Sequence, residues 1–224
     1  MNSRQWFGDM NQKQENGLSD YYSRSWFFSV QNKTKAQDRL KEIIRAEGEN
    51  DGDRLHLAGY SYRMPTAFFF GQNHGTYLTC IRHGDLHGGN IVVSNNGMWK
   101  FIDFGRTGVG HVFEDFVILE NSFRLLRDAS RGMKLGDLVE AELQLLRDGV
   151  CDLEFGQTVQ LIRSLAWENF KTEAKTSYAL AVGLMAFRYL LFDPLEAWQS
   201  RQLAAMVLAA IRFCETSGEK ALGR

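Results

Sequence analysis

Residues 82–106 read RHGDLHGGNIVVSNNGMWKFIDFGR, and this stretch places two histidines, two aspartates and three asparagines between apolar runs. Such a density of polar side chains is typical of a functional site. Within it, IVV and MWKFI have the pattern of two short strands joined by SNNG. Asn-Gly between strands is the strongest short signal for a β-hairpin, because both residues tolerate positive φ. The stretch therefore predicts a hairpin with a polar loop before it and another after it.

If this hairpin forms, three polar side chains come close together. Asp85 and Asn90 lie on one loop, and Asp103 follows the second strand. Because the tight turn folds the second strand back antiparallel, Asp103 returns to the level of Asn90. An Asn oxygen and a carboxylate form an oxygen-only site that suits Mg²⁺. Asp85 is then left to orient a hydroxyl and accept its proton, which completes the minimal set for phosphoryl transfer.

The sequence HGDLHGGN followed by IDFG resembles the catalytic loop and metal loop of protein-kinase-like phosphotransferases. The resemblance is greatest to the aminoglycoside and choline kinase branch, whose loop reads His-Gly-Asp. It implies that Asp85 is the catalytic base and that Asn90 and Asp103 hold the Mg²⁺ that accompanies ATP. It also implies that His83 braces the metal loop and that Asp115 braces the catalytic loop. IDFGRTGVGHVFEDFVILE resembles, more narrowly, a kinase-like domain described as ternary-complex-associated and found in bacterial multi-gene conflict systems.

Four further polar residues lie in or beside this stretch. His87 joins Asp85 and His83 as a catalytic candidate, facing either the substrate, the surroundings of the metal, or solvent. Arg106 is a candidate contact for nucleotide phosphate, with a surface ion pair as the alternative. His111 either touches a substrate or packs in the interior. Glu114 is expected to be an exposed charge in the first turn of a helix, where it suits the helix dipole.

The rest of the chain has a mainly helical pattern. Thr34 is expected to cap a helix that ends near Gly48, residues 55–70 to be extended or irregular, and residues 104–111 to form a glycine-rich loop. Five helices are expected after residue 112. The fold class is therefore α+β and mainly helical. By the resemblance it is a protein-kinase-like C-terminal lobe at residues 34–224 with a small β-hairpin, preceded at residues 1–33 by a loose arm or a remnant of an N-terminal lobe.

Some parts of a complete kinase-like enzyme have no match in the sequence. Such an enzyme has an N-terminal lobe with a glycine-rich strand turn and a strand lysine. No GxGxxG precedes Arg82, and no lysine before it lies in a Val-Ala-x-Lys strand. The expectation is a C-terminal part of an enzyme, or a lobe that a partner chain completes.

The expected function is the ATP- and Mg²⁺-dependent transfer of a γ-phosphate to a hydroxyl of a small molecule or a protein. One alternative is a pseudokinase or regulatory binding module in a bacterial multi-protein system. Another is a metallophosphoesterase, because GDLHGG also resembles the block in which Asp and His of that class bind transition metals. The further blocks GDxxDRG and GNHE of that class are absent.

The composition of the chain bears on which classes of partner and which cellular compartment we expect. The apolar fraction of 44% and the charged fraction of 24% are ordinary for a globular protein. A net charge of −1 does not favour nucleic acid or an anionic membrane as a partner. The three cysteines form no CxxC pair, which fits a reducing compartment. The longest apolar run, at residues 179–192, is too short to span a bilayer. We therefore expect a cytoplasmic protein without nucleic-acid or membrane partners.

Overall fold

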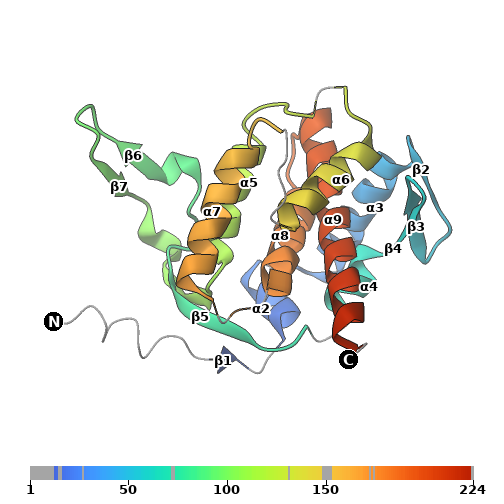
Figure 1. The fold of residues 1–224 in the computed structure, drawn as a ribbon, viewed down its shortest axis with the longest axis horizontal. Coiled ribbons are helices and arrows are strands. Elements are labelled where there is room, and N and C mark those ends of the chain that lie inside the picture. The colour runs from blue at the N-terminus through green and yellow to red at the C-terminus, as the bar shows by residue number, and fades with distance from the viewer. Residues whose placement is uncertain are drawn as a thin grey trace.

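The computed structural model describes residues 13–14, 17–26, 28–71, 74–130, 132–147, 153–171, 173 and 175–222. In these residues the protein is mainly helical, with small sheets at its edges (Figure 1). The helices are α2 (Leu18–Ser25), α3 (Val30–Ile44), α4 (Pro65–Phe70), α5 (Glu114–Arg124), α6 (Leu135–Leu146), α7 (Gly156–Asn169), α8 (Lys175–Tyr189) and α9 (Ala197–Leu222). The strands are β1 (Lys13–Gln14), β2 (Gly48–Asn50), β3 (Arg54–Leu57), β4 (Tyr60–Arg63), β5 (Tyr77–Arg82), β6 (Ile91–Val93), β7 (Trp99–Phe101) and β8 (Gly108–His111).

Helix α8 lies at the centre of the helical core. Its residues from Ser177 to Phe187 are all buried, so the helix is enclosed on every side, as its long apolar run predicts. It packs along α9, and α5 lies on it as well. The close approach of α8 and α9 depends on Gly183, where a Cβ atom would overlap Ala210 and Phe69. The apolar helix expected at this place is confirmed as a core helix, and in the described residues no helix is long and apolar enough to cross a membrane.

A group of polar side chains lies inside this helical core, and its members pair with one another. Glu120 and Arg124 of α5 form an ion pair, Arg124 also binds Glu142 of α6 at 2.9 Å, and Arg163 of α7 binds Glu120 at 2.6 Å. The hydroxyl of Tyr178 on α8 donates to Glu120 at 2.5 Å. Burial alone would raise the pKa of Glu120, but Arg124 and Arg163 outweigh it and hold this pKa at about 2. The network ties α5, α6, α7 and α8 together.

The predicted hairpin is confirmed. β6 and β7 pair antiparallel, with Ile91 opposite Phe101 and Val93 opposite Trp99. The turn closes through a hydrogen bond from the Ser94 amide to the Met98 carbonyl at 2.7 Å. The two strands extend away from the helical body, at the left of Figure 1.

The segment after Asp103 differs from the expected glycine-rich loop. Residues 104–106 form one 3-10 turn, and residues 108–111 form β8, which pairs antiparallel with β5. The register places Arg82 opposite Gly108 and Thr79 opposite His111. Small residues permit a strand here because the side chain of Arg82 passes over Gly110, where a Cβ atom would overlap it. The consequence is that the segments before Asp85 and after Asp103 are joined in one sheet.

The N-terminal third is more regular than expected. Within the expected arm, residues 18–25 form helix α2, and Tyr22 and the following Trp26 are buried. Helix α3 begins at Val30, where the Ser29 hydroxyl accepts from the Asn32 amide at 3.1 Å, so the expected start at Thr34 is wrong. Thr34 instead donates to the Val30 carbonyl one turn earlier. Residues 48–63 form a three-stranded antiparallel meander, and Pro65 begins α4 rather than interrupting an extended segment.

Candidate functional site

The candidate catalytic loop, which contains Asp85, is held in place by Asp115, at the start of α5. The two carboxylate oxygens of Asp115 accept from the backbone amides of His83 at 2.6 Å and Gly84 at 2.8 Å. One rigid side chain thus anchors two consecutive peptides immediately before Asp85. This contact agrees with the supporting position that the family resemblance implies for Asp115.

Gly84 is the residue that lets the loop turn toward Asp85. Its φ is +83°, in the left-handed region that side chains rarely adopt. A Cβ atom here would also overlap the carbonyl of Arg106 and the guanidinium of Arg82. The position therefore requires glycine for two independent reasons, which explains the His-Gly-Asp order.

Asn90 connects the catalytic loop to the metal loop. Its side-chain nitrogen donates to the Asp85 carbonyl at 2.8 Å, which leaves its side-chain oxygen as the atom available to a cation. Its backbone carbonyl accepts from the amide of Ile102 at 3.0 Å, directly before Asp103. Hairpin pairing therefore brings the backbones of Asn90 and Asp103 to the same level, as the sequence predicts.

Asp103 has an unusual backbone conformation. Its φ is 61° and its ψ is 66°, which is the left-handed region, and its side chain is exposed. A residue other than glycine in this region is uncommon, and such residues cluster at functional sites. The conformation separates the hairpin from the 3-10 turn that follows.

His83 is buried against the metal loop. Its Nε2 hydrogen-bonds the Ile102 carbonyl at 2.8 Å, and its ring lies 4.9 Å from that of Phe104. The residue therefore joins the start of the catalytic loop to the residues on both sides of Asp103. This geometry fits a bracing position better than contact with a substrate.

His87 and Arg106 lie at the edge of the site. The Nδ1 of His87 accepts from the Gly89 amide at 3.1 Å, so this ring supports the turn that leads to Asn90. Arg106 places its Nε 3.9 Å from a carboxylate oxygen of Asp85, and 61% of its side chain is exposed. Arg106 is thus an exposed cation beside the candidate base, accessible to an anionic ligand.

The contacts that Tyr21 of α2 and the following Trp26 make with Glu114 could not be predicted from the sequence. Glu114, expected to be exposed, is 1% exposed and forms an ion pair with Arg82 at 2.7 Å. The Tyr21 hydroxyl donates to the same carboxylate, and the Trp26 indole donates to it at 3.0 Å. Burial raises the pKa of Glu114 although Arg82 opposes the shift. The aromatic residues around Tyr21 indicated that part of the N-terminal segment is buried. Nothing in the sequence indicated that Glu114 would be their partner.

His111 belongs to the interior and not to the substrate side. It is fully buried, and its Nδ1 shares a hydrogen bond of 2.7 Å with the Tyr22 hydroxyl. Burial lowers the pKa of His111 to about 3, so the ring is neutral near pH 7. Of its two expected roles, packing is the one that the structure supports.

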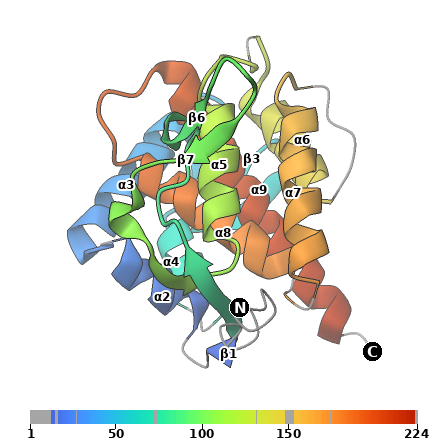
Figure 2. The ribbon, with the colours of Figure 1, turned by 90° about the vertical axis from the view of Figure 1, so that its left-hand side faces the viewer.

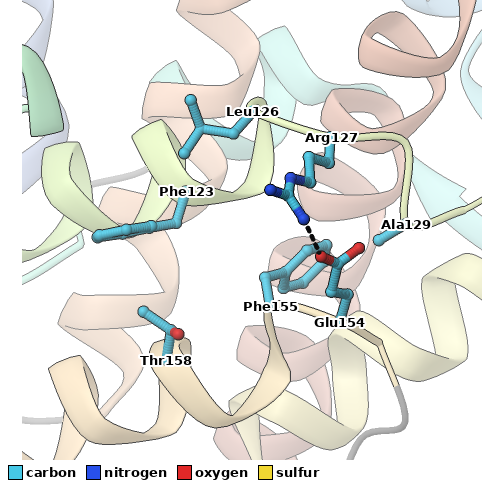
Figure 3. Close-up of a pocket in the computed structure, with 7 residues that line it drawn as sticks. All are labelled: Phe123, Leu126, Arg127, Ala129, Glu154, Phe155 and Thr158. Atoms are coloured by element: carbon cyan, nitrogen blue, oxygen red, sulfur yellow. Dashed lines mark hydrogen bonds and ion pairs between the residues drawn. The ribbon is translucent and has the colours of Figure 1, made fainter.

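A well-formed pocket lies away from these residues. Figure 3 shows it between the C-terminal end of α5 and the start of α7, with the ion pair of Arg127 and Glu154 at 2.8 Å across it. Its volume is about 230 Å³. The lining residues are Phe123, Leu126, Arg127, Ala129, Glu154, Phe155 and Thr158. No predicted site residue lines this pocket.

The residues present fit Mg²⁺ of the kind that accompanies a nucleotide. Among the residues that the structure describes, no three His, Cys, Asp or Glu side chains form a group that could hold a metal ion. An Asn oxygen and one carboxylate are a sparse set, but Mg²⁺ is usually held by one or two carboxylates together with substrate phosphates and water. The free oxygen of Asn90 and the exposed carboxylate of Asp103 meet that description.

Comparison with known proteins supports the family resemblance. Residues 72–144 match the model of the phosphotransferase enzyme family. This third of the chain contains every residue predicted for the site, and the match supports a protein-kinase-like domain of the aminoglycoside and choline kinase branch. No curated protein and no solved structure matches the chain. The narrower resemblance to the ternary-complex-associated domain stays a prediction.

Proposed function

We propose that the protein is a kinase-like phosphotransferase that moves the γ-phosphate of ATP to a hydroxyl. The observation that carries this proposal is the junction at Asn90, which binds the Asp85 carbonyl through its side chain and the Ile102 amide through its backbone. One residue thereby holds the candidate base and the candidate metal loop together. Catalysis of this reaction class depends on such positioning and on electrostatics.

In the proposed reaction the acceptor hydroxyl oxygen forms a bond to the γ-phosphorus while the bond from that phosphorus to the β–γ bridging oxygen breaks. The hydroxyl proton passes to the carboxylate of Asp85, and ADP leaves. Asn90 and Asp103 would hold Mg²⁺, which offsets the negative charge on the phosphates. Asp115 holds the backbone of the loop that carries Asp85, and His83 joins this loop to Ile102, the residue before Asp103.

A second candidate function is a lobe that a partner chain completes. It is supported by the apolar side chains that the hairpin and the adjoining turn leave exposed to solvent. They include Val93, Met98, Trp99 and Phe104, each more than half exposed. A contiguous exposed apolar surface on a soluble protein usually marks a binding site. Its position beside Asp103 suits a nucleotide base, a partner that covers the nucleotide, or both.

Calorimetric binding of ATP with and without Mg²⁺ tests the proposal. We expect Mg²⁺-dependent binding that weakens at least about tenfold in Asp103→Ala, because the only carboxylate proposed to hold the metal is removed. Asp53→Ala is the matched control, since Asp53 is an exposed aspartate on the β2–β3 turn. Equal binding by the wild type and Asp103→Ala would contradict the proposed metal site. If the chain alone binds no nucleotide, the partner-completed lobe is the better description.

A further inference from the structure

Arg82 binds three separate parts of the molecule with one guanidinium. Its Nε lies 2.7 Å from a carboxylate oxygen of Glu114 on α5 and donates to the Tyr21 hydroxyl of α2 at 3.1 Å. Its Nη1 donates to the backbone carbonyl of Arg106, three residues after Asp103, at 3.0 Å. Figure 2 shows β5 running from the level of α2 toward the hairpin, and Arg82 is the last residue of this strand. The side chain therefore links two helices to the candidate metal loop.

Two consecutive residues bind the carbonyls at the two ends of the candidate metal loop. The Nε2 of His83 hydrogen-bonds the Ile102 carbonyl at 2.8 Å, and Arg82 binds the Arg106 carbonyl. Asp103 lies between these two carbonyls, in its left-handed conformation with a φ of 61°. A residue other than glycine keeps such a conformation only where the surrounding structure holds it. The two contacts supply that hold.

The hydrogen bond between Arg82 and Arg106 lies directly against the loop that carries Asp85. A Cβ atom at Gly84 would overlap both the Arg82 guanidinium and the Arg106 carbonyl, so this hydrogen bond passes over the glycine that precedes Asp85. The side chain of Arg106 places its own Nε 3.9 Å from a carboxylate oxygen of Asp85. The contact therefore joins the loop of the candidate base to the loop of the candidate metal ligand.

Arg82 is itself held in one orientation by a buried acceptor. The carboxylate of Glu114 is 1% exposed, and it also accepts from the Tyr21 hydroxyl and, at 3.0 Å, from the Trp26 indole. Burial and the nearby charge of Glu114 raise the pKa of Tyr21 to about 12, so its hydroxyl keeps its proton near pH 7. Gly110 leaves room for the Arg82 side chain and the Tyr21 hydroxyl, because a Cβ atom there would overlap both. A guanidinium packed in this way can place a second group precisely.

We propose that Arg82 is a positioning residue for phosphoryl transfer, which together with His83 holds Asp103 in the conformation that binds Mg²⁺. This inference rests on the proposed phosphotransferase function. Arg82 touches neither the nucleotide nor the acceptor and acts through the backbone of the candidate metal loop. A purely structural ion pair with Glu114 would need only a positive charge at this position. The positioning task needs a fork, because one arm binds the carboxylate while the other binds the carbonyl.

The variant Arg82→Lys separates these two tasks. Lysine keeps a charge beside the buried carboxylate, but its single ammonium does not replace Nη1 on the Arg106 carbonyl. We therefore expect a urea midpoint close to that of the wild type. Arg201→Lys is the matched control, because Arg201 also binds a carboxylate and a backbone carbonyl, those of Glu47 at 2.8 Å and Met133 at 2.6 Å. Neither of these partners is a predicted site residue.

Amide hydrogen exchange without metal or nucleotide measures the hold on the loop directly. The Thr107 amide donates to the Phe104 carbonyl at 3.1 Å, across the turn that ends at Arg106. We expect this amide to exchange at least about fivefold faster in Arg82→Lys, since a charge-assisted hydrogen bond no longer holds the turn. The Ser94 amide in the hairpin turn should exchange as in the wild type. Unchanged exchange at Thr107 would overturn the inference.

The Mg²⁺ requirement of ATP binding, measured by calorimetry, tests the functional part of the inference. We expect Arg82→Lys to need at least about fivefold more free Mg²⁺ for half-maximal binding, and Arg201→Lys to need as much as the wild type. Tyr21→Phe removes the hydroxyl that contacts both Arg82 and Glu114, and it should shift the requirement in the same direction by a smaller factor. A lower urea midpoint with an unchanged Mg²⁺ requirement in Arg82→Lys would mean a purely structural role and would overturn the inference.

The wild type separates failure of this inference from failure of the proposed function. Mg²⁺-dependent ATP binding that is the same in the wild type and in Arg82→Lys would contradict the positioning role and leave the proposed function intact. No binding of Mg²⁺-ATP by the wild type would contradict the proposed function, and the positioning role would fail with it.

Discussion

The catalytic loop and the interior of the helical bundle both gather charged side chains, but the surroundings of these side chains differ. In the bundle, Glu120 is fully buried and contacts Arg124, Arg163 and Tyr178. At the loop, Asp85 has one loose contact with Arg106 and Asp103 is exposed. The oxygens of a fully paired buried carboxylate are occupied, whereas carboxylates without close partners keep their oxygens available to a metal or a hydroxyl. This difference separates the acidic residues that are candidates for catalysis from those that stabilise the fold.

Loss of the Asp85 carboxylate should have the largest effect. We expect Asp85→Asn to lower kcat by about 10²- to 10⁴-fold, the range for removal of a general base, and to leave the unfolding midpoint almost unchanged. Turnover of Mg²⁺-ATP and thermal unfolding of the same samples measure both effects. Full activity in Asp85→Asn would show that this carboxylate is not the base.

Substitution in the buried network should give the opposite pattern. We expect Glu120→Gln to lower the free energy of unfolding by about 3 to 5 kcal/mol, because two buried guanidiniums lose a charged partner. Urea unfolding at pH 7 measures this change. Mg²⁺-ATP binding per folded molecule should stay as in the wild type. A loss below about 1 kcal/mol would mean that the network contributes little to the fold.

Acid should destabilise the buried interior. The pKa of His111 is lowered by burial to about 3 from an ordinary value of 6.5, so the unfolded chain binds a proton that the folded one excludes. Stability is therefore complete above pH 6.5 and falls toward pH 3, with a slope of up to about 1.4 kcal/mol per pH unit. Glu120, whose pKa is about 2 instead of 4.5, adds a second loss between pH 4.5 and pH 2.

Urea unfolding at pH 7, 6, 5 and 4 measures this dependence. The variant His111→Gln cannot titrate and should show a flatter profile between pH 6.5 and pH 5. A wild-type profile without slope in that interval would mean that His111 gains a proton in the folded protein as readily as in the unfolded chain.

An exposed ion pair should matter least. Arg127 and Glu154 lie 2.8 Å apart, but 78% and 61% of their side chains are exposed. We expect Arg127→Gln to change the free energy of unfolding by less than about 1 kcal/mol, because solvent screens such pairs. A loss as large as that of Glu120→Gln would show that burial is not what separates the two kinds of charge.

Features that depend on neighbouring residues were predictable from the sequence. The hairpin follows from Asn96 and Gly97 between two apolar runs, and the course of α8 follows from its continuous apolar stretch. The antiparallel pairing of the hairpin is by itself enough to place Asn90 beside Ile102, the residue before Asp103. The error at the start of α3 is also local, because Ser29 and Thr34 are both good caps and only one can be used.

Other features could not be predicted because they join distant parts of the chain. Glu114 is buried since Trp26, 88 residues earlier, covers it, and no local pattern distinguishes it from an exposed first-turn acid. His111 is likewise enclosed by Tyr22, 89 residues away. The strand β8 forms because β5 provides its partner edge, whereas its own glycine-rich sequence has little preference for a strand.

The sequence by itself determined the chemistry that the protein can offer: an Asp, an Asn and a second Asp at the spacing of a phosphotransferase loop, carried on a hairpin. It could do so because the hairpin closes over a few residues and requires no distant contact. The tertiary structure alone decided which charges are buried and paired and which are left without a partner. Glu114 is buried and paired only because the fold brings Arg82 and Trp26 onto it, since charge pairing depends on distance in space and not on order along the chain.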